Sequence, residues 1–102
     1  MDPKGTLIID HEVAENDEVT LFISGDLDIQ TAPLLKNFIN KVLNEGAANI
    51  NLDLSKLSYL DSSGYGVLVD AKRRSGRTEC NMNMSSLPPW ITEFFDMSAL
   101  NP

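Results

Sequence analysis

Residues 59–76, "YLDSSGYGVLVDAKRRSG", decide the fold because two structural patterns meet there. Apolar residues alternate before this stretch, and a period of two predicts a strand over 48–60. After the serines and glycines, apolar residues recur at helical spacing with basic residues opposite them. This pattern predicts a helix that begins at once and ends at Gly76. The serines therefore lie where a strand gives way to a helix.

Two further strands are predicted near the start of the chain. Residues 6–13 and 18–24 are rich in β-branched and apolar side chains. The residues between them are polar and typical of a turn, so the two strands are expected to form a hairpin. The second strand is expected to end at Gly25, with a loop after it.

A helix is predicted next, with Thr31 as its N-cap and Pro33 in its first turn. Gly46 is a natural end for it. One apolar stripe is expected to face the core: Leu34, Leu35, Phe38, Ile39, Val42 and Leu43.

Residues 78–85 alternate between apolar and polar side chains and predict a last strand. A short helix is expected within 87–100. The order is strand, strand, helix, strand, helix, strand, helix. It predicts an α/β fold with a central mixed β-sheet of about four strands, helices packed on it and an N-terminal hairpin.

Composition narrows the class of protein. A chain of 102 residues is long enough for one small domain. Its formal net charge of −7 weighs against nucleic acid or an anionic membrane as a partner, and favours a basic protein or cleft. The single cysteine, Cys80, allows no internal disulfide and is expected to be a buried structural thiol. No signal peptide is recognised at the start, so a cytoplasmic protein is expected.

The serine turn has two structural interpretations. Ser62 or Ser63 could cap the helix, as serines before helices commonly do. Gly64 and Gly66 are harder to explain, since each costs a helix about 1 kcal/mol relative to alanine. Either the helix packs tightly on the sheet there, or a partner approaches closely.

Enzymatic interpretations fit poorly. A nucleophile elbow needs a glycine two residues before the serine, where Leu60 and Asp61 stand instead. The only histidine, His11, is on the first strand, and no phosphate-loop lysine is present. Asp26, Asp28 and Asp61 could gather at one end of the sheet and bind a cation or act as acid and base, but loop aspartates more often just end strands. No enzyme activity, metal or cofactor is expected.

A serine that is itself a substrate needs only exposure on a rigid turn. Phosphate would add about −1.5 to −2 charges at pH 7. A helix N-terminus would accept that charge, whereas Asp61 would repel it. Phosphorylation is thus expected to change partner binding more than folding.

The segment "LDLSKLSYLDSSGYGVLVDAKRR" (52–74) resembles the central motif of STAS domains, in particular of bacterial anti-sigma factor antagonists. "LFISGDLDIQTAPLL" (21–35) is similar to the family's second signature, and "ITEFFDMSAL" (91–100) to its late helix. The resemblance covers about 7–100 and implies one STAS domain over 1–102. Tyr65 replaces a common aliphatic residue. Family members usually continue with another strand and helix, so a shortened C-terminus is expected.

The resemblance implies a partner switch. The unphosphorylated protein would bind an anti-sigma factor that is also a serine kinase, and so release a sigma factor. The kinase would phosphorylate Ser63 and end binding, and a PP2C-type phosphatase would restore it. The residues implied in partner binding are Asp26, Asp28, Thr31, Ala32, Asp61, Ser62, Ser63, Gly64, Tyr65 and Gly66.

Other functions stay open. The main alternative is a STAS scaffold subunit of a larger regulatory, stressosome-like or transport-linked complex. A nucleotide-binding STAS domain and a hydrolase follow in that order. Exposed apolar surface near Phe94, Phe95 and Leu100 could also favour a homodimer.

Overall fold

The computed structural model describes residues 6–94. It contains four strands and three helices in the predicted order. They are β1 (Leu7–Val13), β2 (Val19–Leu27), α1 (Ala32–Asn44), β3 (Asn49–Leu60), α2 (Ser62–Arg77), β4 (Asn81–Ser85) and α3 (Pro89–Phe94).

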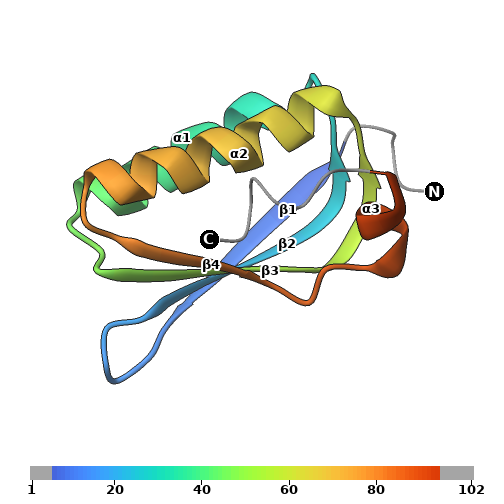
Figure 1. Ribbon diagram of the computed structural model, residues 1–102. Coiled ribbons are helices and arrows are strands. Elements are labelled where there is room, and N and C mark those ends of the chain that lie inside the picture. Colours follow the sequence, from blue (N-terminus) through green and yellow to red (C-terminus); the bar gives the residue numbers. More distant parts are fainter. Residues whose placement is uncertain (1–5, 95–102) are drawn as a thin grey trace.

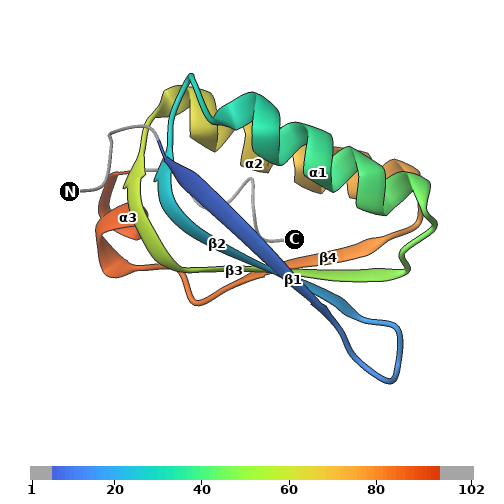
Figure 2. The same cartoon turned by 180° about the vertical axis from the view of Figure 1, so that it is seen from behind.

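The strands form one mixed sheet in the order β1-β2-β3-β4. β1 and β2 pair antiparallel as the predicted hairpin, while β3 lies parallel to both β2 and β4. Helices α1 and α2 lie side by side over one face of this sheet, and α3 lies beside the carboxyl end of β3 (Figure 1). The view from behind shows the same two layers (Figure 2). The predicted α/β fold is therefore confirmed.

The core lies between the sheet and the two long helices. Each strand places alternate side chains toward the helices, as a period of two requires. The helices return apolar residues at intervals of three and four. The largest fully buried side chains are Leu21, Ile23, Leu27, Leu35, Ile39, Ile50, Leu52, Leu54, Leu68, Met82 and Ile91.

Two glycines do not end their elements, contrary to the prediction. β2 runs through Gly25 to Leu27, with a register shift between Gly25 and Asp26. Gly25 has φ of +97°, and a Cβ there would lie 2.3 Å from the Thr6 carbonyl oxygen, so glycine allows both the bulge in the pairing with β3 and the close approach of the residue before β1. Gly76 lies inside the last turn of α2 and keeps an ordinary helical backbone.

Three other expectations have mixed outcomes. Gly46, at φ of +86°, follows the end of α1 as predicted. Leu34 was expected in the apolar stripe but is 51% exposed. Cys80 is buried, and desolvation raises the pKa of its thiol. The structure does not describe residues 95–102 or the side chain of Phe94. The expectations of exposed apolar surface near Phe94, Phe95 and Leu100 and of a shortened C-terminus therefore lie outside the described residues.

The sheet face away from α1 and α2 carries mostly polar side chains, together with the exposed apolar residues Ile8 and Phe22. A shallow hollow of about 310 Å³ lies around Phe22 on β2 and Lys56 on β3. None of the helices that the structure describes is long and apolar enough to cross a bilayer.

Candidate functional site at the start of α2

The candidate site forms where β2 and β3 end side by side. Leu27 pairs with Leu60 at the last position of the two strands. The Asp61 N–H then donates a hydrogen bond to the Leu27 carbonyl oxygen across 3.3 Å. The loop that follows β2 is thereby brought against the first turn of α2, although more than 30 residues separate the two in sequence.

Asp61 caps α2. Its backbone is extended, with φ of −111° and ψ of −176°, and its Oδ1 accepts a hydrogen bond from the Gly64 N–H at 3.0 Å. This arrangement is the usual one for a helix N-cap. Ser62 and Ser63 therefore lie in the first turn of the helix. Neither is the helix cap, which was one interpretation of these serines from the sequence.

The two serine hydroxyls are consequently uncommitted. In the part of the chain that the structure describes, neither Ser62 nor Ser63 uses its side chain in a hydrogen bond. Ser62 is exposed, and Ser63 is half-buried. The first turn of α2 contains no acidic residue, so its free N–H groups and the positive end of the helix dipole face these hydroxyls without a competing charge inside the turn.

The loop between β2 and α1 is locked by reciprocal bonds between Asp28 and Thr31. The Asp28 Oδ1 accepts from the Gln30 N–H at 2.9 Å and from the Thr31 N–H at 3.0 Å. In return, the Asp28 N–H donates to the Thr31 Oγ1 at 2.9 Å, and that hydroxyl donates to the Asp26 carbonyl oxygen at 2.7 Å. Thr31 thus fixes the loop with its side chain and does not cap its own helix.

These bonds divide the predicted binding residues of the loop by role. Thr31 and Ala32 are buried, so they can shape the loop but offer little surface to a partner. Asp28 is half-buried, with one oxygen already engaged. The exposed tip of the loop consists of Ile29 and Gln30.

Gly64 and Gly66 have different environments. A Cβ on Gly64 would lie 2.5 Å from the Leu27 carbonyl oxygen and 2.9 Å from the Leu60 Cδ1. Tight packing of the helix on the sheet therefore explains Gly64. A Cβ on Gly66 would meet nothing within 4 Å, so packing does not explain that residue.

The prediction missed exposed apolar side chains at this end of the sheet. Ile29 is 71% exposed, and Tyr59, which pairs with Asp26 across the strands, is 50% exposed. Large apolar residues near a functional turn are typical of a protein interface. Their positions in the sequence contained a signal, since Ile29 lies two residues after the end of β2 and Tyr59 directly precedes the buried Leu60, so both cannot face the core.

The structure places the single histidine of the chain away from the serine turn. His11 lies on β1 opposite Leu21, and its ring packs 5.9 Å from that of Phe38, measured between centroids. No group of three His, Cys, Asp or Glu residues within 6–94 is arranged to hold a metal ion.

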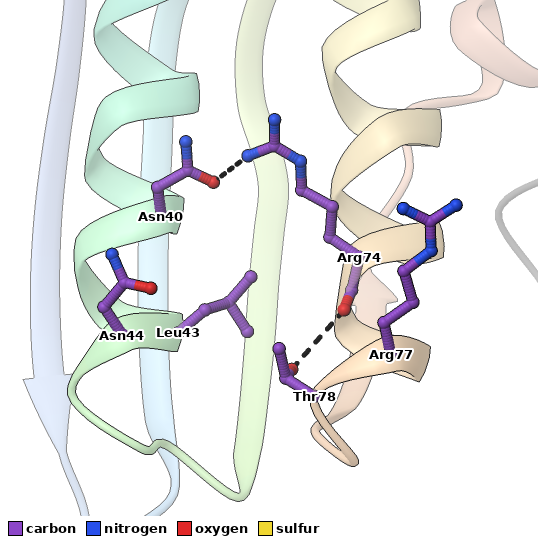
Figure 3. A pocket seen from close by; sticks show the side chains of 6 residues that line it. All are labelled: Asn40, Leu43, Asn44, Arg74, Arg77 and Thr78. Atoms are coloured by element: carbon purple, nitrogen blue, oxygen red, sulfur yellow. Dashed lines mark hydrogen bonds between the residues drawn. The ribbon is translucent and has the colours of Figure 1, made fainter.

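The opposite end of α2 contains a hollow of a different kind (Figure 3). It has a volume of about 340 Å³ and lies between the carboxyl ends of α1 and α2. It is lined by Asn40, Leu43, Asn44, Arg74, Arg77 and Thr78. α2 is about 24 Å long, given 16 helical residues at a rise of 1.5 Å, so the hollow at its carboxyl end is separate from the serine turn at its amino end.

The fold and this turn define a STAS domain. A model of that family, described as "Mlab, STAS domain", matches residues 11–102. The chain therefore belongs to the STAS domain family.

Curated relatives include proteins named anti-sigma-B factor antagonist. The chain is 27% identical over 92 residues to the one from Bacillus subtilis, which covers 90% of this chain and 83% of that protein. It is 25% identical over 88 residues to the one from Staphylococcus epidermidis, with 86% and 82% covered.

Solved structures share the fold. The Bacillus anti-sigma factor antagonist SpoIIAA in its unphosphorylated form superposes with a TM-score of 0.76 at 23% identity, over 93% of this chain and 84% of that one. An anti-sigma factor antagonist from Mycobacterium paratuberculosis gives 0.73 at 23% identity, over 82% and 70%.

Proposed function

We propose that this protein is an anti-sigma factor antagonist that acts as a phosphorylation-controlled partner switch. Its unphosphorylated form binds an anti-sigma factor with serine kinase activity, and so frees a sigma factor. Phosphorylation of Ser63 ends that binding, and a PP2C-type phosphatase restores it. The curated relatives named anti-sigma-B factor antagonist support the antagonist part of this proposal. The work is done in the cytoplasm by binding, and the protein itself catalyses no reaction.

One observation carries the proposal: Ser63 lies in the first turn of α2, and within residues 6–94 its hydroxyl makes no hydrogen bond. The cap of α2 is supplied by Asp61, so replacing or modifying Ser63 removes no structural hydrogen bond within 6–94. A side chain that the fold does not use, held on a helix that the core anchors, is suited to be a substrate.

Electrostatics explain why phosphate would switch binding and not folding. The modified side chain would gain about −1.5 to −2 charges beside the free N–H groups of the first turn, which favour an anion. Asp61 in the cap and Asp28 in the neighbouring loop already make this surface acidic. A partner surface that binds beside these carboxylates would then face additional negative charge, and its binding would weaken.

The test is phosphate mapping after incubation with ATP and the cognate anti-sigma factor kinase. We expect one phosphate on Ser63, absent from Ser63→Ala and retained in Ser62→Ala. Ser63→Ala should still bind the kinase, whereas Ser63→Asp should fold normally and bind at least tenfold more weakly, a change of about 1.4 kcal/mol. If Ser63→Asp bound as tightly as the parent, release by added charge would be wrong.

A second candidate is a STAS scaffold subunit within a larger complex. The observation that favours it is the uncovered sheet face, where Ile8 and Phe22 are exposed beside a hollow. Light scattering after size-exclusion chromatography tests this candidate. A stable assembly that is unchanged in the Ser63→Asp variant would favour the scaffold. A monomer that binds the kinase would favour the switch.

A further inference from the structure

We infer that the groove between α1 and α2, toward their carboxyl ends, is a docking surface for an acidic polypeptide segment. This surface lies away from the serine turn and does not depend on the proposed function. Two features of the molecule support it: the way charge is divided over the chain, and the side chains that line the groove.

The two long helices are basic, although the chain as a whole is acidic. The net charge is −7, from eight Lys and Arg residues and fifteen Asp and Glu residues. Six of the eight cationic side chains lie on α1 and α2, whereas the two helices contain one acidic residue, Asp70. The six are Lys36, Lys41, Lys72, Arg73, Arg74 and Arg77. Charge that served only solubility would be mixed in sign over the surface, not separated in this way.

The groove is walled by one stripe of side chains from each helix. Two hollows lie along it and share Asn40 and Arg74, so they belong to one groove. Members of each stripe are three or four residues apart and therefore lie on the same side of their helix. Asn40 and Arg74 point toward one another across the wider hollow (Figure 3). The stripes are Lys36, Asn40 and Asn44 on α1, and Asp70, Arg74 and Arg77 on α2.

The fold uses only part of the positive charge in this groove. Within residues 6–94, the ion pairs are those of Asp70 with Arg73 and Arg74. Lys36 lines the same narrow part of the groove as Asp70, so one carboxylate lies among three cations. Arg77 is exposed, lines the wider hollow and makes no ion pair within 6–94. The lining of that hollow contains no acidic side chain.

The helix dipole explains only some of these positions. Cations in the last turn of a helix offset the partial negative charge there, which accounts for Lys41, Arg74 and Arg77. It does not account for Lys36, which lies in the first half of α1. The same dipole favours acidic residues in the first turn, and neither α1 nor α2 has one there. The excess positive charge is therefore available to an anionic ligand.

An acidic polypeptide segment fits this groove better than a larger polyanion does. Guanidinium groups bind carboxylates through paired hydrogen bonds, and the amides of Asn40 and Asn44 add further donors. A bilayer or a nucleic-acid duplex extends well beyond the groove. The rest of the chain, which holds all the acidic residues except Asp70 and the two following the helices, would repel such a surface.

A fluorescent octaglutamate peptide is the probe, titrated with the protein at low ionic strength and followed by anisotropy. We expect saturable binding that weakens as salt is added. Lys36→Gln and Arg77→Gln should each lower the affinity about threefold, the effect of one exposed ion pair. Asp70→Asn should raise the affinity by a similar factor, because it removes the one carboxylate of the groove.

Lys56→Gln is the matched control, since it removes the same charge from β3, beside the hollow on the other face of the sheet. It should leave the affinity unchanged. Circular dichroism equal to that of the parent shows that each variant is folded. No kinase is present in the titration, so its result leaves the proposed function standing in either case.

Three results would overturn the inference. The first is no binding of octaglutamate, or an equal loss in Lys56→Gln, which would mean that the peptide responds to overall charge. The second is tighter binding of phosphatidylglycerol vesicles or of a DNA duplex than of the peptide. The third is self-association that Arg77→Gln abolishes, measured by light scattering, because the occupant would then be a second copy of the chain.

Discussion

The two ends of α2 use their polar groups in opposite ways. At the carboxyl end, Arg74 bonds to Asp70 with its Nε at 3.0 Å from Oδ2, and it also donates to the Asn40 side chain of α1. The Thr78 N–H and the Cys80 N–H donate hydrogen bonds to carbonyl oxygens of the last turn. At the amino end, the serine hydroxyls have no such bonds.

If the proposed function holds, this difference assigns stability to the carboxyl end of α2 and contact with the kinase partner to the amino end. Arginine near a carboxyl terminus offsets the helix dipole, and its bond to Asn40 ties α2 to α1 (Figure 3). At the amino end, Asp61 supplies the cap, and within residues 6–94 the Ser63 hydroxyl makes no hydrogen bond and a Cβ on Gly66 would meet nothing. Substitutions at the carboxyl end should therefore change stability, and substitutions at the amino end should change kinase binding. Gly64 and Asp61 are exceptions, because they are at the amino end but contribute to stability.

Gly64→Ala should have the largest effect, because Gly64 is the one residue of the amino end that is packed like a core residue. Its new Cβ would overlap the Leu27 backbone oxygen, which cannot turn away as a side chain would. We expect a loss of about 3 kcal/mol, at the upper end for overpacking. Denaturant unfolding measures it.

Gly66→Ala is the control for Gly64→Ala, since it makes the same change two residues along the helix. It should raise stability where Gly64→Ala lowers it. Equal losses in both variants would show that the first turns of α2 are sensitive as a whole, and the division between packed and bare glycine would be wrong.

Asp61→Ala should have an intermediate effect at the same end. It removes the hydrogen bond to the Gly64 N–H, and loss of an N-cap costs about 1 kcal/mol. Asp61→Asn is the matched variant, because asparagine caps equally well but carries no charge. Thermal unfolding should separate the two, with Asp61→Asn close to the parent.

Asp61→Asn also tests the electrostatic part of the switch. With the neighbouring carboxylate gone, phosphate on Ser63 should reduce kinase binding by a smaller factor than in the parent. An unchanged factor, measured by titration of both phosphorylated proteins, would mean that Asp61 contributes only as a cap.

The sequence predicted the elements that depend on local pattern. The alternation in β3 and the αL glycine at Gly46 each depend on neighbours along the chain, and both were placed correctly. The predictions that a strand ends at Gly25 and a helix at Gly76 were wrong, because glycine occurs in several kinds of local structure. Whether it ends a strand, allows a bulge or continues a helix depends on distant residues, such as Thr6 beside Gly25.

The site was predictable in location but not in its division of roles. The motif places Ser63 at the start of a helix, yet Ser62 or Ser63 was considered as its cap, and the structure shows that Asp61, with its extended backbone, caps it instead. Likewise, the roles of Gly64 and Gly66 differ because Leu27, far away in sequence, packs under one and not the other.

The smallest effect is expected at the carboxyl end, from the ion pairs of Asp70. Its carboxylate accepts from Arg73 at 2.9 Å and pairs with Arg74, but Arg73 is 65% exposed, so the pairs should contribute only about 0.5 kcal/mol. Asp70→Asn should lose that amount at neutral pH. It should leave kinase binding unchanged, because the serine turn is at the far end of the helix.

The pH dependence gives this last prediction its sharper form. The hydrogen bond from Arg73 lowers the pKa of the Asp70 carboxyl, with the charge of Arg74 adding to it and partial burial opposing it. A carboxyl whose pKa is lower in the folded state contributes stability above its unfolded pKa, near 4, and loses that contribution as the pH falls through its folded pKa. The stability difference between the parent and Asp70→Asn should thus be constant from pH 7 to about 5 and shrink below pH 4. A difference that persisted at pH 2 would assign the effect to packing of the side chain and not to its charge.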